Sequence, residues 1–125
     1  MKIPVMLLEL SHKKLIAWQK AISLLPLIYA VCNKLPADEK FNLCAQLKRA
    51  TLSISNNIAE GAARRTNKDK NHFFTMARSS ISEVDNCLTA CLVLKFVTEE
   101  EISAVNISLV EVFKLVSGLI ESNRE

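Results

Sequence analysis

Apolar residues recur along this chain at alternating spacings of three and four, and they do so in four separate stretches. This period is typical of amphipathic α-helices that bury one stripe of side chains in a shared core. Alternation at period two, which would indicate half-buried strands, extends nowhere beyond a few residues. The pattern therefore predicts an all-α four-helix bundle, with helices at about 13–34, 38–62, 67–95 and 99–122.

Local signals mark the ends of these helices. The residue before Pro36 is driven out of the helical region, so the first helix is expected to end there. Thr66 with Asp69, and Thr98 with Glu101, each match the capping box that opens a helix. These two pairs predict where the third and fourth helices begin.

Length and composition agree with one helical domain. The chain has 125 residues, of which 50% are hydrophobic and 23% are charged, and it contains only 2 Gly and 3 Pro. Such a chain can bury a core of its own and has too few turn-forming residues for a many-stranded sandwich. We expect one domain over 1–125, with residues 1–12 as an arm and a first helix kinked or split near 22–25 by Pro26.

Basic residues gather in the middle of the chain. The net charge is +3, but between residues 48 and 78 seven basic residues stand against two acidic ones. One interpretation is a basic, solvated loop between the second and third helices; the other is a surface that contacts RNA or DNA phosphates. In the second, the contact is carried by Arg64, Arg65, Lys68 and Lys70, with Lys48 and Arg78 secondary.

The cysteines and the apolar stretches indicate in which cellular compartment the protein is expected. Cys32, Cys44, Cys87 and Cys91 form no CxxC pair and have no His at zinc-finger spacing, so we expect core packing in a reducing cytoplasm, without metal or cofactor. The first ten residues are too interrupted for a signal peptide. Residues 21–32 fall short of the ~20 that a membrane span needs, so no membrane partner is expected.

The second predicted helix carries a polar stripe beside its apolar seam. The side of this helix opposite the apolar seam holds mostly small or apolar groups and a single charge, which is unusual for a solvent-exposed face. Since a four-helix monomer of this length does not easily cover such a face, we expect a homo-oligomer. The stripe consists of Gln46, Arg49, Ser53, Asn57 and Glu60.

Two interpretations of the stripe stay open. In one, it is a buried hydrogen-bonded network between helices or subunits, in which Arg49 pairs with an acid such as Glu83 and Asn57 bridges backbone groups. In the other, Arg49, Glu60 and Glu83 form a ligand or catalytic site. The sequence favours the network, because no nucleophilic triad and no glycine-rich phosphate loop stand out. We therefore expect no enzymatic activity.

The second-helix string resembles a known family. Residues 46–61, QLKRATLSISNNIAEG, are similar to the signature of the four-helix-bundle proteins encoded in intervening sequences of bacterial large-subunit ribosomal RNA genes. The resemblance spans about residues 11–121. Further matches are LIAWQKA at 15–21, LP at 35–36 followed by Glu39, Phe41 and Leu43, and ARSSISE at 77–83.

This resemblance implies an antiparallel, up-and-down bundle that assembles as a ring-like homo-oligomer, a pentamer, with no established enzymatic activity. A related branch comprises accessory proteins of diversity-generating retroelements, which bind a reverse transcriptase and nucleic acid. The chain has Ala63 and Ser79 where the family usually has glycine, which we expect to stiffen the end of the second helix and widen a helix contact. The characteristic polar residues that carry over are Gln46, Arg49, Ser53, Asn57, Glu60, Arg65, Ser80 and Glu83.

Two functional hypotheses follow. The first is a non-enzymatic, ring-forming bundle whose basic junction between the second and third helices contacts nucleic-acid phosphates. The second is a protein-interaction scaffold or accessory subunit, for example for a reverse transcriptase, in which the 1–10 arm or a groove docks the partner. The first predicts salt-dependent binding of RNA or DNA, and the second predicts negligible binding at physiological salt.

Overall fold

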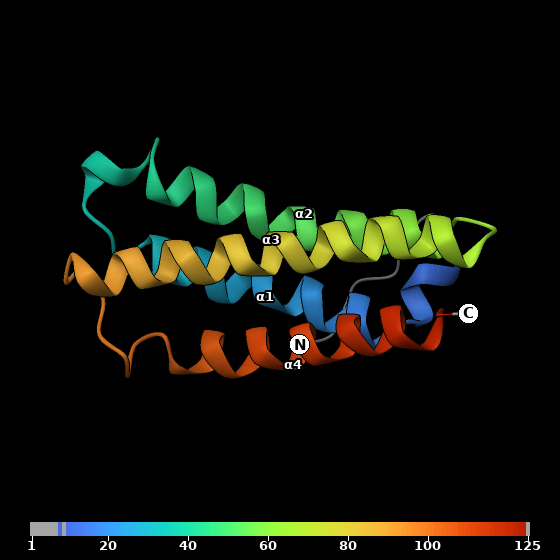
Figure 1. Cartoon of the computed structure of the whole chain (residues 1–125). Helices are drawn as coiled ribbons and strands as arrows, with labels where there is room; N and C mark the ends of the chain where they lie inside the picture. The colour runs from blue at the N-terminus through green and yellow to red at the C-terminus, as the bar shows by residue number, and fades with distance from the viewer. Residues whose placement is uncertain (1–7, 9, 125) are drawn as a thin grey trace.

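The computed structural model describes residues 8 and 10–124 of the chain. Within that part it contains four α-helices, two short 3-10 helices and no strand, which confirms the predicted all-α class (Figure 1). The α-helices are α1 (Ile16–Cys32), α2 (Leu43–Ala62), α3 (Asn67–Val93) and α4 (Ser103–Ser122), and the 3-10 helices are η1 (Ser11–Lys14) and η2 (Ala37–Glu39).

The four α-helices lie side by side around one core (Figure 1). α2 packs most extensively against α3, while α1 lies against both α2 and α4, and α3 also lies against α4. The order around the core is therefore α1, α2, α3, α4. The largest fully buried apolar side chains come from all four helices and include Leu24, Ile28, Leu47, Ile54, Ile58, Val84, Val112 and Val116.

α2 begins at Leu43, later than the predicted position 38. Residues 37–39 form η2 instead, and Asn42 has φ −118° and ψ −98°, outside the helical region. The Asn42 side chain donates to Glu39 Oε1 at 2.9 Å and accepts from Gln46 Nε2 at 3.1 Å. Because such side-chain hydrogen bonds offer an alternative to the helical ladder, the predicted helix is divided here.

α1 also starts later than predicted, and it is not split. The residues before it form η1, and Leu15 is extended with ψ 127°, so the α-helix begins at Ile16 instead of position 13. From there α1 continues as one helix through Pro26, so the predicted split is wrong. Pro26 is exposed whereas Leu24 and Ile28 are fully buried, and this burial offsets the missing backbone hydrogen bond.

Both predicted capping pairs form their hydrogen bonds, and the first lies directly before its helix. Thr66 Oγ1 accepts from the Asp69 amide at 3.1 Å, directly before α3. The Thr98 amide donates to Glu101 Oε1 at 3.0 Å, and the Glu101 amide donates to Thr98 Oγ1 at 3.2 Å. α4 itself starts later than the predicted position 99, because Ile102, at φ −103° and ψ 7°, separates this cap from the regular helix.

All four cysteines are free and buried, as expected for core packing. The thiols of Cys32 and Cys44 donate to each other's main-chain carbonyl, at 3.8 Å and 3.6 Å. Burial raises the pKa of Cys32 to about 12 and that of Cys91 to about 11, so both stay protonated at neutral pH. Within residues 8 and 10–124, no group of three or more His, Cys, Asp and Glu side chains is arranged to hold a metal ion.

α4 is the one helix in the described part of the chain that is long and apolar enough to cross a membrane. Its most apolar window has a mean hydropathy of 1.6, and 28% of that window is buried in the bundle. A helix with one face in a protein core meets the same criterion of length and composition. That inner face consists of Val105, Leu109, Val112, Val116 and Ile120. Outside this inner face, α4 exposes Ile107, Val110 and Phe113 next to the charged Glu111 and Lys114.

Candidate nucleic-acid interface

α2 and α3 meet at a tight junction, and Gly61 sets how close they come. A Cβ atom added to Gly61 would lie 2.6 Å from Cε1 of Phe74 and 3.1 Å from the main-chain oxygen of Lys70. Glycine leaves room for this contact, and Phe74 cannot move aside easily because it is buried in the core. The last turn of α2 and the first turns of α3 are therefore held together at one end of the bundle (Figure 1).

Two of the four cations predicted at this junction are engaged within the chain. Arg64 Nη2 pairs with Glu60 Oε2 at 2.9 Å, and Arg64 Cζ lies 4.5 Å from the centre of the Phe73 ring. Lys70 Nζ donates to the carbonyl of Ala62 at 3.2 Å, at the C-terminus of α2, where positive charge is stabilising. Both side chains therefore help to hold the junction.

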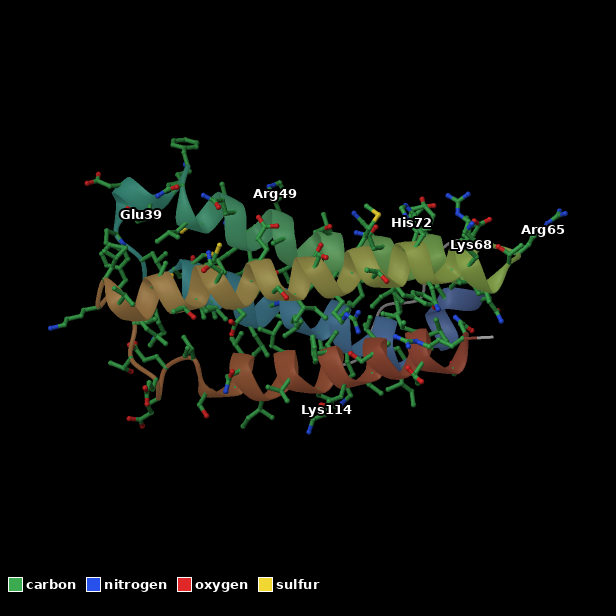
Figure 2. All side chains as sticks on the ribbon, in the orientation of Figure 1. Glu39, Arg49, Arg65, Lys68, His72 and Lys114 are labelled. Atoms are coloured by element: carbon green, nitrogen blue, oxygen red, sulfur yellow. The ribbon has the colours of Figure 1, made fainter. Side chains whose placement is uncertain are left out.

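The other two, Arg65 and Lys68, extend from the end of the bundle into solvent (Figure 2). Among the residues that the structure describes, neither forms an ion pair. Thr66 lies between them and caps α3, so the positively polarised first turn of α3 adjoins both. An anion at this position would meet two unpaired cationic side chains and the positive end of a helix, beside the single carboxylate of Asp69 in the first turn of α3.

Lys48 and Arg78 lie away from the junction. Lys48 Nζ is 4.4 Å from the centre of the Tyr29 ring of α1, and it lies about 21 Å along α2 from the junction at 1.5 Å per residue. Arg78 is half-buried on α3, about 16 Å from the start of that helix. The structure thus does not bring the six predicted cations into one surface.

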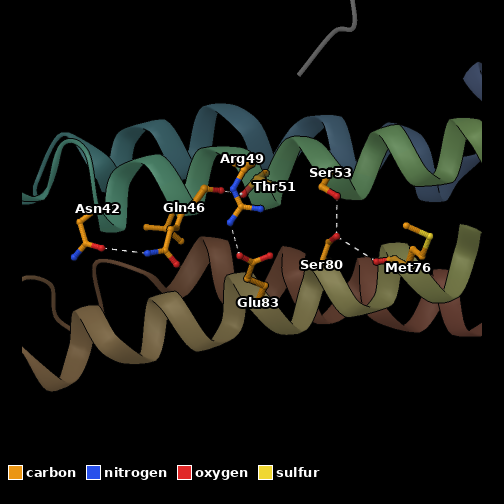
Figure 3. A network of polar contacts seen from close by, with 9 residues as sticks. Asn42, Gln46, Arg49, Thr51, Ser53, Met76, Ser80 and Glu83 are labelled. Atoms are coloured by element: carbon orange, nitrogen blue, oxygen red, sulfur yellow. Dashed lines mark hydrogen bonds and ion pairs between the residues drawn. The ribbon is translucent and has the colours of Figure 1, made fainter.

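The polar stripe of α2 faces α3 (Figure 3). Arg49 Nη2 and Glu83 Oε2 form the expected ion pair at 2.8 Å, and the hydroxyl oxygens of Ser53 and Ser80 are 2.9 Å apart. Asn57 Nδ2 donates to the Ser53 carbonyl at 2.9 Å and to Ser53 Oγ at 3.1 Å. Arg49 and Ser53 of the stripe therefore link α2 with α3, whereas Asn57 bonds within α2.

The ion pair is more exposed than the predicted buried network requires. The Arg49 side chain is 65% exposed and the Glu83 side chain 37%, whereas the predicted network was buried. An exposed pair contributes about 0–1 kcal/mol to stability, far less than a buried one that loses its partner. Glu60, the third member of the alternative site, lies about 16 Å along α2 from Arg49 and pairs with Arg64. The structure does not bring these three groups together.

Two links at the junction end of the bundle were not predicted. Asn71 Nδ2 donates to the carbonyl of Ile120 at 3.0 Å, and Asn123 Nδ2 donates to Asn71 Oδ1 at 3.2 Å. They join the beginning of α3 to the end of α4. No local pattern signals such a link, because it depends on which helix ends meet. A cavity of about 250 Å³ at this end is lined by Ser11, Leu15, Ala62, Lys70, Phe74, Leu119 and Asn123.

Ala63 and Ser79, which stand where the family usually has glycine, are both exposed. Ala63 has φ −82°, in the right-handed helical region, so that position requires no glycine. Neither residue belongs to the buried core between the helices. The structure gives no basis for the expected widening of a helix contact.

Comparison with known proteins gives the family of this chain. A family model described as 23S rRNA-intervening sequence protein matches residues 13–118. No curated protein matches the chain. The matched residues contain α1, α2, α3 and most of α4, and with them the junction and the polar stripe. The chain therefore belongs to the 23S rRNA-intervening sequence protein family.

Proposed function

We propose that the chain is a non-enzymatic subunit of a cytoplasmic, ring-like homo-oligomer that binds RNA or DNA phosphates at the α2–α3 junction. The observation that carries this proposal is the position of Arg65 and Lys68. Both are exposed, both lack an ion pair within the described residues, and both adjoin the N-terminus of α3. Phosphates bind such groups through charge and main-chain amides without reading the bases. Binding is therefore salt-dependent and indifferent to sequence.

A ring multiplies the modest charge of one junction. The pairing of Arg49 with Glu83 and of Ser53 with Ser80 supports the antiparallel order of α2 and α3 that the family resemblance implies. An up-and-down bundle has this junction at one end, and rotational symmetry carries the same end of every copy to one side of a ring. A pentamer, the number that the resemblance implies, presents five junctions to one nucleic acid.

A second candidate is a protein-interaction scaffold or accessory subunit, for example for a reverse transcriptase, with no nucleic-acid contact of its own. The exposed apolar face of α4 favours a protein partner. The predicted 1–10 docking arm lies almost entirely outside the described residues. We propose no membrane partner, because α4 buries its other face among the helices of the bundle.

Fluorescence anisotropy of a labelled structured RNA and a labelled duplex DNA, at low and at physiological salt, tests the proposal. Arg65→Gln/Lys68→Gln removes the two unpaired cations. Its matched control, Lys40→Gln/Lys95→Gln, removes two exposed cations from the α1–α2 and α3–α4 connections at the other end of the bundle, neither of which forms an ion pair among the described residues (Figure 1). We expect the junction variant to lower the slope of log affinity against log salt by about two for each junction that contacts the nucleic acid, and the control to leave the slope near the wild-type value.

Arg64→Gln is expected to weaken binding less than either substitution of the pair, because Glu60 already neutralises Arg64. Equal losses in the junction variant and its control would show that the junction is not the contact. Flat titrations of the wild type at both salts would overturn the nucleic-acid proposal and favour the scaffold.

A further inference from the structure

Three large apolar side chains of α4 are exposed on one outer side of the bundle. Ile107, Val110 and Phe113 follow one another at spacings of three and are 66%, 46% and 41% exposed; they are called here the α4 face. Beside them a groove of about 330 Å³ opens between α3 and α4 and includes Asp85 among its lining residues. A contiguous row of large exposed apolar side chains marks a surface of association.

A second apolar surface lies between α1 and α2. A groove of about 450 Å³, called here the α1–α2 groove, is lined by Leu25, Pro26, Tyr29, Lys48 and Leu52. Tyr29 and Leu52 are 50% and 47% exposed. Lys48 Nζ lies over the Tyr29 ring, 4.4 Å from its centre. The groove therefore combines apolar walls with one cation.

The two surfaces lie on different sides of the bundle. The α4 face belongs to a helix that packs against α1 and α3, whereas the groove lies between α1 and α2. A contact that joins two different surfaces is heterologous, since each copy offers one surface to the copy before it and the other to the copy after it. A ring of more than two identical chains requires such a contact, because a self-complementary contact stops at a dimer.

The two surfaces also lie at similar heights along the bundle. Lys20 of α1 and Glu111 of α4 form an ion pair at 3.5 Å, and α1 begins at the end of the bundle where α4 ends (Figure 1). Leu25 and Ile107 therefore both lie about 6–8 Å from this ion pair, in the same direction. A contact that seats Ile107 beside the Leu25 end of the groove joins copies side by side with little translation along the bundle, and the ring closes when the rotation between neighbouring copies divides a full turn.

The charges beside the two surfaces are complementary. In the described part of the chain, Lys48 of the groove has no ion-pair partner, and neither does Asp85 beside the α4 face. Glu111 is a second carboxylate on the outer side of α4, and Lys114 is the cation there. Because Glu111 is already paired with Lys20, Asp85 is the carboxylate of the α4 side that is available to the ammonium group of Lys48.

We propose that the α4 face of one copy docks in the α1–α2 groove of the next copy, and that repetition of this contact closes the ring. The inference rests on the proposed homo-oligomer and identifies the two surfaces that form it. Ile107 packs beside Leu52 in the groove, and Lys48 pairs with Asp85 of the adjoining copy. α4 is about 30 Å long, which suits a contact of ordinary size, about 800 Å² on each partner. Lys48 then belongs to the contact between copies, not to the nucleic-acid surface.

Two single variants test this contact. Ile107→Lys places a cation opposite Lys48, and Leu52→Glu places a carboxylate opposite Asp85. Both positions are exposed, so the helical content measured by circular dichroism is expected to persist. In size-exclusion chromatography with light scattering, each variant alone is expected to dissociate the ring, with an association constant lowered about 30-fold or more. Val93→Lys and Phe41→Glu, at exposed apolar positions outside both surfaces, are the matched controls and keep the wild-type mass.

An equal mixture of the two variants tests whether the contact joins different surfaces. The Leu52→Glu chain keeps an intact α4 face, and the Ile107→Lys chain keeps an intact groove. One native contact can therefore form between the two chains, and native mass spectrometry is expected to detect complexes that contain both. Should a charged variant lose its helical spectrum, Ile107→Ser and Leu52→Ser replace the pair.

The contact is rejected if both single variants keep the wild-type mass. It is also rejected if only one of the two variants dissociates the ring, because a contact between the α4 face and the groove requires both surfaces. If both variants keep the mass of the wild-type ring and the wild type binds RNA, the proposed function stands and this contact alone is rejected. A monomeric wild type removes both the ring and the contact, whereas the anisotropy titration tests nucleic-acid binding separately.

Discussion

Gly61 and Phe74 are in direct contact where α2 ends and α3 begins, so that a Cβ atom on Gly61 would lie 2.6 Å from Cε1 of the Phe74 ring. Gly61 is required because a larger side chain would not fit there. Its backbone conformation is one that any residue can adopt, since no described glycine has a positive φ. This contact sets the approach of the two helices that carry the polar stripe and the junction cations.

Gly61→Ala is expected to lower the free energy of unfolding by about 1–3 kcal/mol, the usual cost of overpacking a buried contact. Neither neighbour can yield easily, since Phe74 is buried and the other close atom is the main-chain oxygen of Lys70. Urea denaturation measures the change. Gly118→Ala is the control, because a Cβ atom there meets nothing within 4 Å, and it should raise the free energy of unfolding by about 0.5–1 kcal/mol. If both substitutions raised the free energy of unfolding, the contact between Gly61 and Phe74 would relax without cost.

The ion pair between Arg49 and Glu83 is expected to contribute little to stability. A double-mutant cycle with Arg49→Ala and Glu83→Ala should give a coupling energy of about 0.2–1 kcal/mol, because both side chains are exposed to water. The oligomer mass from light scattering should not change, since both partners belong to the same chain. A coupling energy that is larger, or that resists high salt, would indicate that a second copy buries this pair.

Glu101 is expected to make stability depend on pH in the acidic range. A hydrogen bond from Lys34 and others from Thr98 lower its pKa below the usual 4.5. Because its pKa is lower in the folded chain than in the unfolded chain, its contribution is complete above the unfolded value and is lost as pH falls through the folded value. Thermal unfolding at pH values from 7 down to about 3 should show a weaker acid dependence for Glu101→Gln than for the wild type. Glu99→Gln, at an exposed neighbouring position, is the control and should follow the wild type.

The buried cysteines are expected to resist thiol reagents in the native protein. Burial raises the pKa of Cys32, Cys87 and Cys91, so little thiolate is present at pH 8, and the sulfur atoms are covered. Labelling with a chromogenic disulfide should be at least about 100-fold slower in buffer than in urea, because the reagent reaches the sulfur atoms only after the chain opens locally. Ser103→Cys, at an exposed position, supplies the fast control. Rapid labelling of the native wild type would show that the end of the bundle near Cys32 opens readily.

The same thiols are expected to destabilise the fold at alkaline pH. Their pKa is higher in the folded chain than the ordinary value of 9.0, with Cys32 at about 12 and Cys91 at about 11. The unfolded chain therefore releases these protons first, and the free energy of unfolding falls as pH rises from about 9 through the folded values. Cys32→Ala and Cys91→Ala should each make this decline shallower in urea titrations between pH 8 and about 11. If the free energy of unfolding declines as steeply in both variants as in the wild type, other titrating groups cause the decline.

The sequence by itself determined the class of the fold and the place of its charge. Apolar spacing is a local property, so four helices could be predicted from it, and the Thr66 and Thr98 caps form between residues three apart. Arg64, Arg65, Lys68 and Lys70 lie in one short connection, so any fold that joins the two helices places them near each other. The family resemblance was also present in the sequence, because its signature is a continuous string along one helix.

Only the tertiary structure decided which side chains face water and which helix ends meet. Arg49 is exposed and Lys48 lies over Tyr29 because of how each helix is rotated about its axis, and spacing along one helix does not specify that rotation. The contact between Gly61 and Phe74 depends on the angle between two helices, and α1 remains one helix through Pro26 because the core holds the residues on either side. The apolar outer face of α4 reads in the sequence like any buried stripe. It stands out once the other helices have filled the core from the opposite side.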